Sequence, residues 1–136
     1  MPDSRIGDRD QPLATGVILL VEDDDGIRGI FEAALSGAGY TVHTARSGAG
    51  ALTRLRTESF DLVVLDLMLP GITGPEVLDA MRQGPATAQL PVIVVTGATL
   101  NQRELGSLNV VTMLRKPLDP DDLVDAVYLA LHGRQQ

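Results

Sequence analysis

Cysteine is absent from this chain of 136 residues, so the chain can form neither a disulfide nor a metal site with thiolate ligands. It also lacks an apolar run long enough to cross a bilayer. The opening stretch MPDSRIGDRDQPLATG is polar and carries charges of both signs, without the apolar centre of a signal peptide. We therefore expect a cytoplasmic protein that makes no membrane contact.

Positive charge is the scarcer sign. Eleven Lys and Arg residues stand against 18 Asp and Glu residues, for a formal net charge of −7. The basic residues form no cluster, and an acidic domain without one is a poor candidate for direct nucleic-acid binding. Lys116 is the only lysine in a chain that otherwise uses arginine. A compact ammonium is not interchangeable with a planar guanidinium, so Lys116 is a candidate for a specific role.

The rest of the composition is that of a globular domain. Hydrophobic residues make up 44% of the chain, which is too many for a disordered segment. The length suits one domain with a single sizeable core. We interpret residues 1–15 as a flexible N-terminal leader and residues 16–133 as one folded domain.

Two hydrophobic periods alternate along this domain. Short β-branched runs predict strands at Val17–Val21, Tyr40–Thr44, Leu62–Leu65, Pro91–Val95 and Val110–Leu114. Helical spacing lies between and after them, with starts at Ser47, Thr73 and Asp119, a first helix around 27–35 and a weaker one within 100–108. Apolar strands without polar alternation are typical of a parallel sheet covered on both faces. The pattern therefore predicts a doubly wound α/β fold with a five-stranded parallel sheet and helices on both faces.

Polar residues follow four of these strands. Glu22 and Asp23 come after the first, Asp66 after the third, Thr96 after the fourth and Lys116 after the fifth. In such folds ligands bind outside the carboxyl ends of the strands, so these side chains should meet at one edge. Oxygen ligands without His or Cys select a hard cation, Mg²⁺ or Mn²⁺. A carboxylate can also be a nucleophile that forms an aspartyl-phosphate, which makes Asp66 a candidate phosphoryl acceptor.

Four segments follow one another along the chain: ILLVEDDDGIR, DLVVLDLMLPGITG, PVIVVTG and LRKPLDPDDL. In sequence and order they resemble the response-regulator receiver domains of two-component signalling, the CheY-like family, in a collinear match from about Val17 to Leu131. The resemblance implies a flavodoxin-like (βα)5 fold. It also implies that Asp66 is the phosphoacceptor, Thr96 the switch hydroxyl and Lys116 the phosphate contact, that the Gly97 amide lies near the phosphate, and that the peptide bond after Lys116 is cis.

The resemblance also implies a metal site. Asp23 and Asp66 would bind Mg²⁺ directly, Glu22 would hold it through water, and Met68 would contribute its backbone carbonyl. One departure concerns Met113, which stands where the family usually carries Tyr or Phe. The segment from Thr96 to Lys116 is also about two residues short. Both changes fall on the usual output surface.

The expected function is that of a stand-alone receiver, not an enzyme beyond its own phosphorylation and dephosphorylation. A sensor histidine kinase or phosphotransfer protein would supply the phosphoryl group. Output would pass to a downstream protein or a homodimer through the face formed by residues 100–131. One alternative is a pseudo-receiver that binds its partner constitutively. A metal-dependent phosphatase is disfavoured. Such enzymes carry the pattern Asp-x-Asp-x-Thr, in which the second aspartate is the general acid/base, and here Met68 stands at that position and cannot transfer protons.

Overall fold

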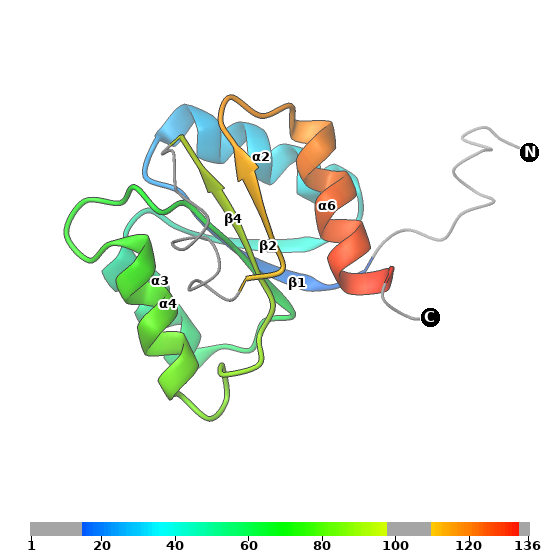
Figure 1. Ribbon diagram of the computed structural model, residues 1–136. Coiled ribbons are helices and arrows are strands. Elements are labelled where there is room, and N and C mark those ends of the chain that lie inside the picture. Colours follow the sequence, from blue (N-terminus) through cyan, green and yellow to red (C-terminus); the bar gives the residue numbers. More distant parts are fainter. Residues whose placement is uncertain (1–14, 98–109, 134–136) are drawn as a thin grey trace, which may run out of the picture.

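The computed structural model describes residues 15–97 and 110–133, and these form a single sheet with helices (Figure 1). The elements, in chain order, are β1 (Val17–Val21), α2 (Asp25–Gly37), β2 (Thr41–Ala45), α3 (Gly48–Thr57), β3 (Leu62–Leu65), α4 (Gly74–Gln83), β4 (Val92–Thr96), β5 (Thr112–Arg115) and α6 (Pro120–His132). The predicted bounds of the strands are correct to within two residues. The helix expected within 100–108 lies outside the described residues.

The sheet is parallel throughout, with strand order β2-β1-β3-β4-β5. The strand order therefore reverses direction between β1 and β3, which is where α/β sheets of this kind open a crevice for ligands. In register, Val21 pairs with Ala45 on one side and with Leu65 on the other. This register brings the carboxyl ends of β1 and β3 level. The predicted α/β fold class is confirmed.

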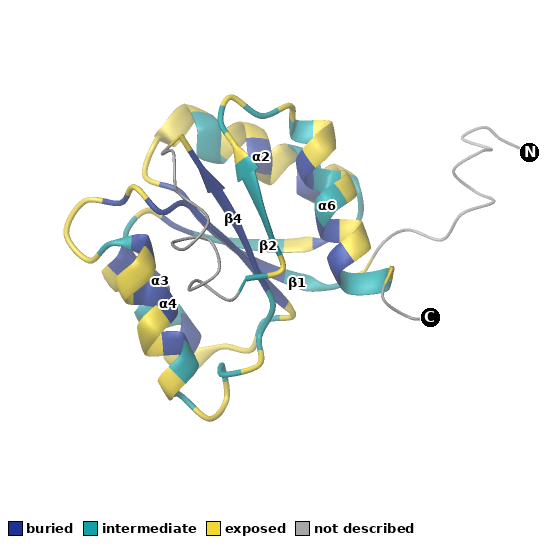
Figure 2. Ribbon diagram, viewed as in Figure 1, coloured by how far each residue is buried: buried dark blue, intermediate teal, exposed yellow. Residues whose placement is uncertain are grey.

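Helices cover both faces of the sheet, α2 and α6 on one and α3 and α4 on the other (Figure 1). Successive residues of β1 point to opposite faces. Leu19 and Val21 pack with the α3 and α4 side, and Ile18 and Leu20 with the α2 and α6 side. Strands β3 and β4 are buried at every position, as two-sided coverage requires (Figure 2).

The helix starts follow from capping chemistry. Ser47 accepts a hydrogen bond from the Gly50 amide (3.0 Å), and Asp119 accepts one from the Asp121 amide (2.8 Å). Thr73 and Glu76 form a reciprocal capping box at α4. These three predicted starts are confirmed. Within the described ranges, no helix is both long and apolar enough to cross a membrane.

Candidate functional site

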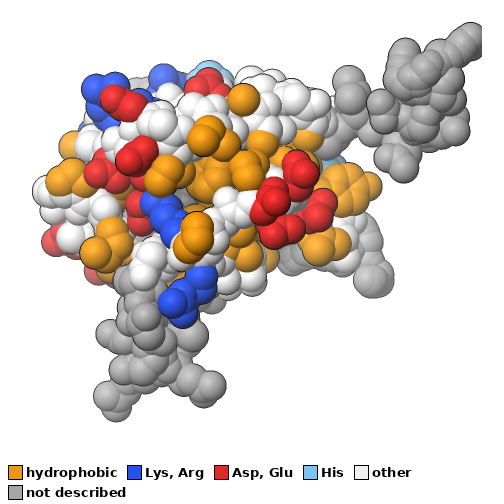
Figure 3. All heavy atoms as spheres, turned by 90° about the horizontal axis from the view of Figure 1, so that it is seen from above, with side chains coloured by type: hydrophobic (Ala, Val, Ile, Leu, Met, Phe, Trp, Pro, Cys, Tyr) orange, Lys and Arg blue, Asp and Glu red, His pale blue; other side chains and the backbone are white. Residues whose placement is uncertain are grey.

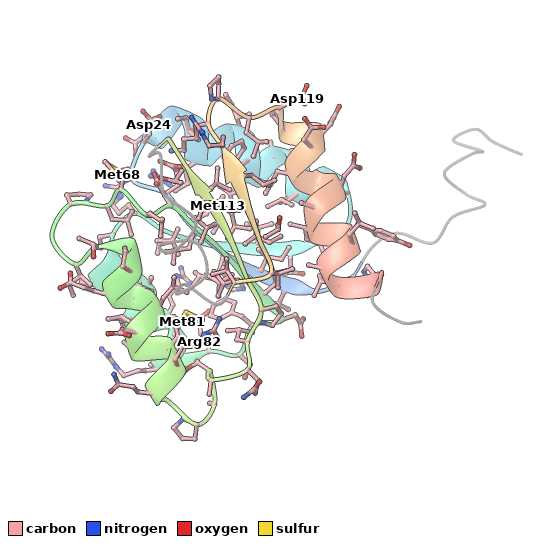
Figure 4. All side chains as sticks on the ribbon, in the orientation of Figure 1. Asp24, Met68, Met81, Arg82, Met113 and Asp119 are labelled. Atoms are coloured by element: carbon pink, nitrogen blue, oxygen red, sulfur yellow. The ribbon has the colours of Figure 1, made fainter. Side chains whose placement is uncertain are left out.

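The carboxyl-end edge of the sheet gathers the polar residues that follow the strands. The ladder continues one residue past each strand: Glu22 N donates to Ala45 O (3.0 Å), Asp66 N to Val21 O (3.1 Å) and Lys116 N to Thr96 O (3.0 Å). These bonds place the three side chains before the chain turns away from the sheet. Figure 4 shows Asp24 and Met68 at the same edge, with Met81 and Arg82 toward the other end of the molecule.

A lysine joins two carboxylates at this edge. Lys116 Nζ lies 2.8 Å from Glu22 Oε1 and 2.9 Å from Asp66 Oδ2. Glu22 and Asp66 are only 2% and 3% exposed. A buried carboxylate is costly without a partner, so the ammonium explains how two of them are accommodated at the end of an apolar core.

Burial and pairing act in opposite directions on these groups. Burial raises the pKa of Glu22, and the hydrogen bonds from Lys116 and from the Asp24 amide only partly offset it. Burial lowers the pKa of Lys116, but its hydrogen bonds to Glu22 and Asp66 outweigh this and the pKa is raised overall. The lysine therefore stays charged at neutral pH, and the site holds a fixed positive charge beside Asp66.

The second oxygen of Asp66 is held by the segment that follows it. Asp66 Oδ1 accepts a hydrogen bond from the Met68 amide (2.9 Å). The Met68 side chain is turned out and is 63% exposed, while Leu67 and Leu69 on either side are buried. Buried and exposed side chains therefore alternate along this segment, and the two buried leucines anchor it to the core. This anchoring keeps the Met68 backbone beside Asp66.

Two glycines let helices pack against the same segment. A Cβ on Gly74 would lie 2.8 Å from the Asp66 carbonyl oxygen, closer than real Cβ atoms approach. A Cβ on Gly48, at the start of α3, would overlap the Ile72 carbonyl. The N-terminal ends of α3 and α4 can therefore close on the segment after Asp66 only because these positions carry no side chain.

The carboxylates fit a hard divalent cation. Glu22, Asp23 and Asp66 can each offer one carboxylate oxygen such that all three lie within 4.8 Å of one another. Glu22 and Asp66 are buried and Asp23 is exposed, so this group opens to solvent on one side. Oxygen donors without nitrogen or sulfur suit Mg²⁺ or Mn²⁺, which keep several waters in such sites.

The other predicted site residues lie at the same edge. Thr96 is the last residue of β4, not the residue after it, and its exposed fraction is 0%. Gly97 follows directly and is exposed. The Lys116–Pro117 peptide bond is cis, as expected. Met113, on β5, is half-buried against the α3 and α4 side of the core.

Sequence reasoning missed Arg28, which contacts the acidic segment after β1. Its Nη1 donates to the Glu22 carbonyl oxygen (2.9 Å). A positive charge near the N-terminus of a helix interacts unfavourably with the helix dipole. An arginine at this position is therefore unusual, and that is the signal that could have singled it out.

The comparisons with known proteins agree with this architecture. The family model described as "Response regulator receiver domain" matches residues 18–128. The chain is 34% identical over 116 residues to sporulation initiation phosphotransferase F of Bacillus subtilis, covering 84% of this chain and 94% of that protein. The chain therefore belongs to the response-regulator receiver domain family of two-component signalling.

Other relatives are longer than this chain. Transcriptional regulatory protein AfsQ1 of Streptomyces coelicolor is 49% identical over 79 residues, which cover 58% of this chain and 34% of that protein. NtrC of Escherichia coli is 32% identical over 126 residues, 89% of this chain and 26% of that protein. The chain thus spans about a third or less of these relatives. Among solved structures, chemotaxis protein CheY4 of Vibrio cholerae matches with a TM-score of 0.81 at 28% identity, over 87% of this chain and 100% of that one.

Proposed function

We propose that Asp66 accepts a phosphoryl group in a Mg²⁺-dependent phosphorelay. One observation carries this proposal: Asp66 is buried at a strand end, with one oxygen 2.9 Å from the Lys116 ammonium and the other 2.9 Å from the Met68 amide, beside two further carboxylates. A carboxylate used only for solubility would lie in solvent.

The transfer is a displacement at phosphorus. One carboxylate oxygen of Asp66 forms the new P–O bond, while the bond from phosphorus to the donor's imidazole nitrogen breaks and that nitrogen keeps the electron pair. Lys116 then pairs with the charge on the phosphoryl oxygens. The Thr96 hydroxyl and the Gly97 amide take the remaining oxygens, as in the family that the chain belongs to.

The residues that would hold the cation are Asp23, Asp66 and the backbone carbonyl of Met68, with Glu22 acting through water. When bound, Mg²⁺ supplies charge neutralisation for the phosphoryl oxygens, which lowers the repulsion between them and the acidic side chains. Asp23 is the exposed carboxylate of this set, so it faces the side from which a donor approaches.

The donor is a sensor histidine kinase or a phosphotransfer protein in the cytoplasm, and the output is a protein contact. Phosphorylation shifts a two-state equilibrium of the face formed by residues 100–131, which then binds a downstream protein or a second copy. Residues 100–109 of this face lie outside the described residues. Figure 3 looks onto the site edge, where the Lys and Arg side chains lie in small separate groups among acidic and hydrophobic ones. This arrangement favours a protein partner over direct nucleic-acid binding.

Met113 supports one alternative, a pseudo-receiver that binds its partner without phosphorylation. Methionine can repack but has no ring to rotate and no hydroxyl to offer a partner. Under this alternative the acidic site would be unused.

Intact-mass analysis after incubation with a small-molecule phosphodonor and Mg²⁺ separates the two functions. The parent chain is compared with Asp66→Asn, each with and without chelator. We expect one added phosphoryl group on the parent, absent in the variant and in the presence of chelator. No adduct on the parent under any condition would refute the proposal and favour the pseudo-receiver.

A further inference from the structure

Arg28 contacts three successive carbonyl groups of the acidic segment. Its backbone amide donates to Asp24 O (2.9 Å), as the first turn of α2 requires. Its guanidinium Nη1 donates to Glu22 O (2.9 Å) and makes a longer contact with Asp23 O (3.5 Å). The Arg28 side chain is only 13% exposed, so these contacts are largely shielded from water.

The acidic segment has few other restraints on its course. The Glu22 amide bonds to β2, and the Asp24 amide donates to Glu22 Oε2 (3.1 Å). The Asp24 side chain caps α2 by accepting from the Ile27 amide (2.8 Å). Among the described residues, Arg28 is the one whose side chain holds the carbonyls of both Glu22 and Asp23.

The direction in which a side chain leaves the backbone is set by the two peptide planes that flank its Cα, so holding a residue's carbonyl restrains the direction of its side chain. Between β1 and α2 the chain turns within three residues, and in this turn Glu22 must point inward to Lys116 while Asp23 stays exposed beside it. Both carbonyls are reached by one guanidinium nitrogen, Nη1, which carries two N–H groups, while Nη2 pairs with Asp25 and so fixes the plane of the guanidinium.

We propose that Arg28 is a positioning residue of the cation site: by holding the carbonyls of Glu22 and Asp23, it fixes the directions in which their carboxylates point. This inference rests on the proposed function for the use of the site by Mg²⁺. The contact with the segment itself is independent of any cation.

The charge of Arg28 and its positioning role predict opposite changes in Mg²⁺ affinity when Arg28 is replaced, so one measurement can distinguish them. Arg28 adds a positive charge near the carboxylates, so its field repels a divalent cation. Replacing it with a neutral residue should tighten Mg²⁺ binding if the charge is all that matters. Positioning predicts weaker binding instead, and loss of groups that orient metal ligands typically weakens metal binding by about 10- to 100-fold.

Arg46 offers a matched control. Both arginines pair with Asp25 Oδ1, Arg46 at 3.5 Å, but the Arg46 side chain is 72% exposed. Arg46→Met therefore removes a charge from the same carboxylate, while the guanidinium contacts that Arg28 makes with Glu22 O and Asp23 O stay in place. Arg28→Lys retains the charge and most of the stem but loses the planar guanidinium that engages these carbonyls and Asp25 together.

The experiment measures Mg²⁺ affinity by titration calorimetry, after circular dichroism and thermal melting show that each variant is folded at the assay temperature. We expect about 10-fold or greater weakening in Arg28→Met, a smaller weakening in Arg28→Lys, and parent-like or slightly tighter binding in Arg46→Met. Equal or tighter binding in Arg28→Met would overturn the inference, as would equal weakening in Arg46→Met.

A second readout needs no cation. In chelator, the Asp24 amide should exchange with deuterated solvent faster in Arg28→Met than in the parent, while the Gly50 amide, capped by Ser47, should not change. Unchanged exchange at Asp24 would overturn the positioning role. If the parent binds no Mg²⁺, the proposed function loses its cation, and the exchange result alone decides the role of Arg28.

Discussion

Removing the ammonium of Lys116 should destabilise the protein and make its stability depend on pH. In Lys116→Met the apolar stem remains, but Glu22 and Asp66 lose the charge that lies 2.8 and 2.9 Å from their oxygens. Removing one partner of a buried ion pair costs about 3–5 kcal/mol. We expect Lys116→Met to lose about 3 kcal/mol of unfolding free energy at pH 8 in chelator, the lower end of that range. The loss is at the lower end because water can reach the two carboxylates from the side of the exposed Asp23.

The loss of unfolding free energy in Lys116→Met should become smaller as the pH falls. Burial already raises the folded-state pKa of Glu22 above its ordinary value of 4.5, and loss of the ammonium removes a group that lowers it. The folded variant therefore takes up a proton at a higher pH than its unfolded chain does. Protonation relieves the uncompensated charge, so the variant regains stability relative to the parent as the pH falls from 8 toward 5.

Urea denaturation at pH 8 and at pH 5.5 measures the loss of stability and its dependence on pH. Equal slopes of the unfolding free energy against urea concentration would show that the folded and unfolded states of parent and variant are equally compact. Glu22→Gln combined with Lys116→Met is the matched control, because it removes one of the carboxylates left unpaired. The double variant should lose less stability than the single Lys116→Met variant. A single variant as stable as the parent, or one with the same deficit at both pH values, would refute the reasoning.

Other predictions concern the packing of the folded chain and the lifetime of its phosphorylated form. Tyr40→Phe removes a buried hydroxyl that has no hydrogen-bond partner among the described residues; unfolding in urea should show unchanged or slightly higher stability, and a loss above about 1 kcal/mol would contradict this. Gly74→Ala places a methyl group 2.8 Å from the Asp66 carbonyl oxygen and should cost about 1–3 kcal/mol. By contrast, Gly29→Ala, which meets nothing within 4 Å in α2, should gain about 0.5–1 kcal/mol in the same measurement. If Asp66 is phosphorylated as proposed, Met68→Asn puts a polar group beside that site and should shorten the phosphoryl half-life measured by intact mass; an equal or longer half-life would count against a role for Met68.

The sequence determined the fold class and the order of the site residues. Buried, β-branched runs without polar alternation are compatible with few arrangements other than a covered parallel sheet, and capping residues are local signals. For that reason the strands and the starts at Ser47, Thr73 and Asp119 were predicted closely. Glu22, Asp66 and Lys116 were also predicted to meet, because parallel strands end at one edge.

Only the tertiary structure decided how these residues meet. The pattern could not show that Lys116 contacts both Glu22 and Asp66, or that Arg28 reaches back to the carbonyls of the acidic segment. It also could not show that Gly74 admits the backbone at Asp66. Periodicity and capping depend on neighbours within a turn or two of the chain. The Lys116 contacts depend instead on strand register and side-chain rotamers, which are set by packing between segments far apart in sequence. The Arg28 and Gly74 contacts are closer in sequence, but they depend on how the start of each helix folds back onto the end of the preceding strand, which no periodic pattern encodes.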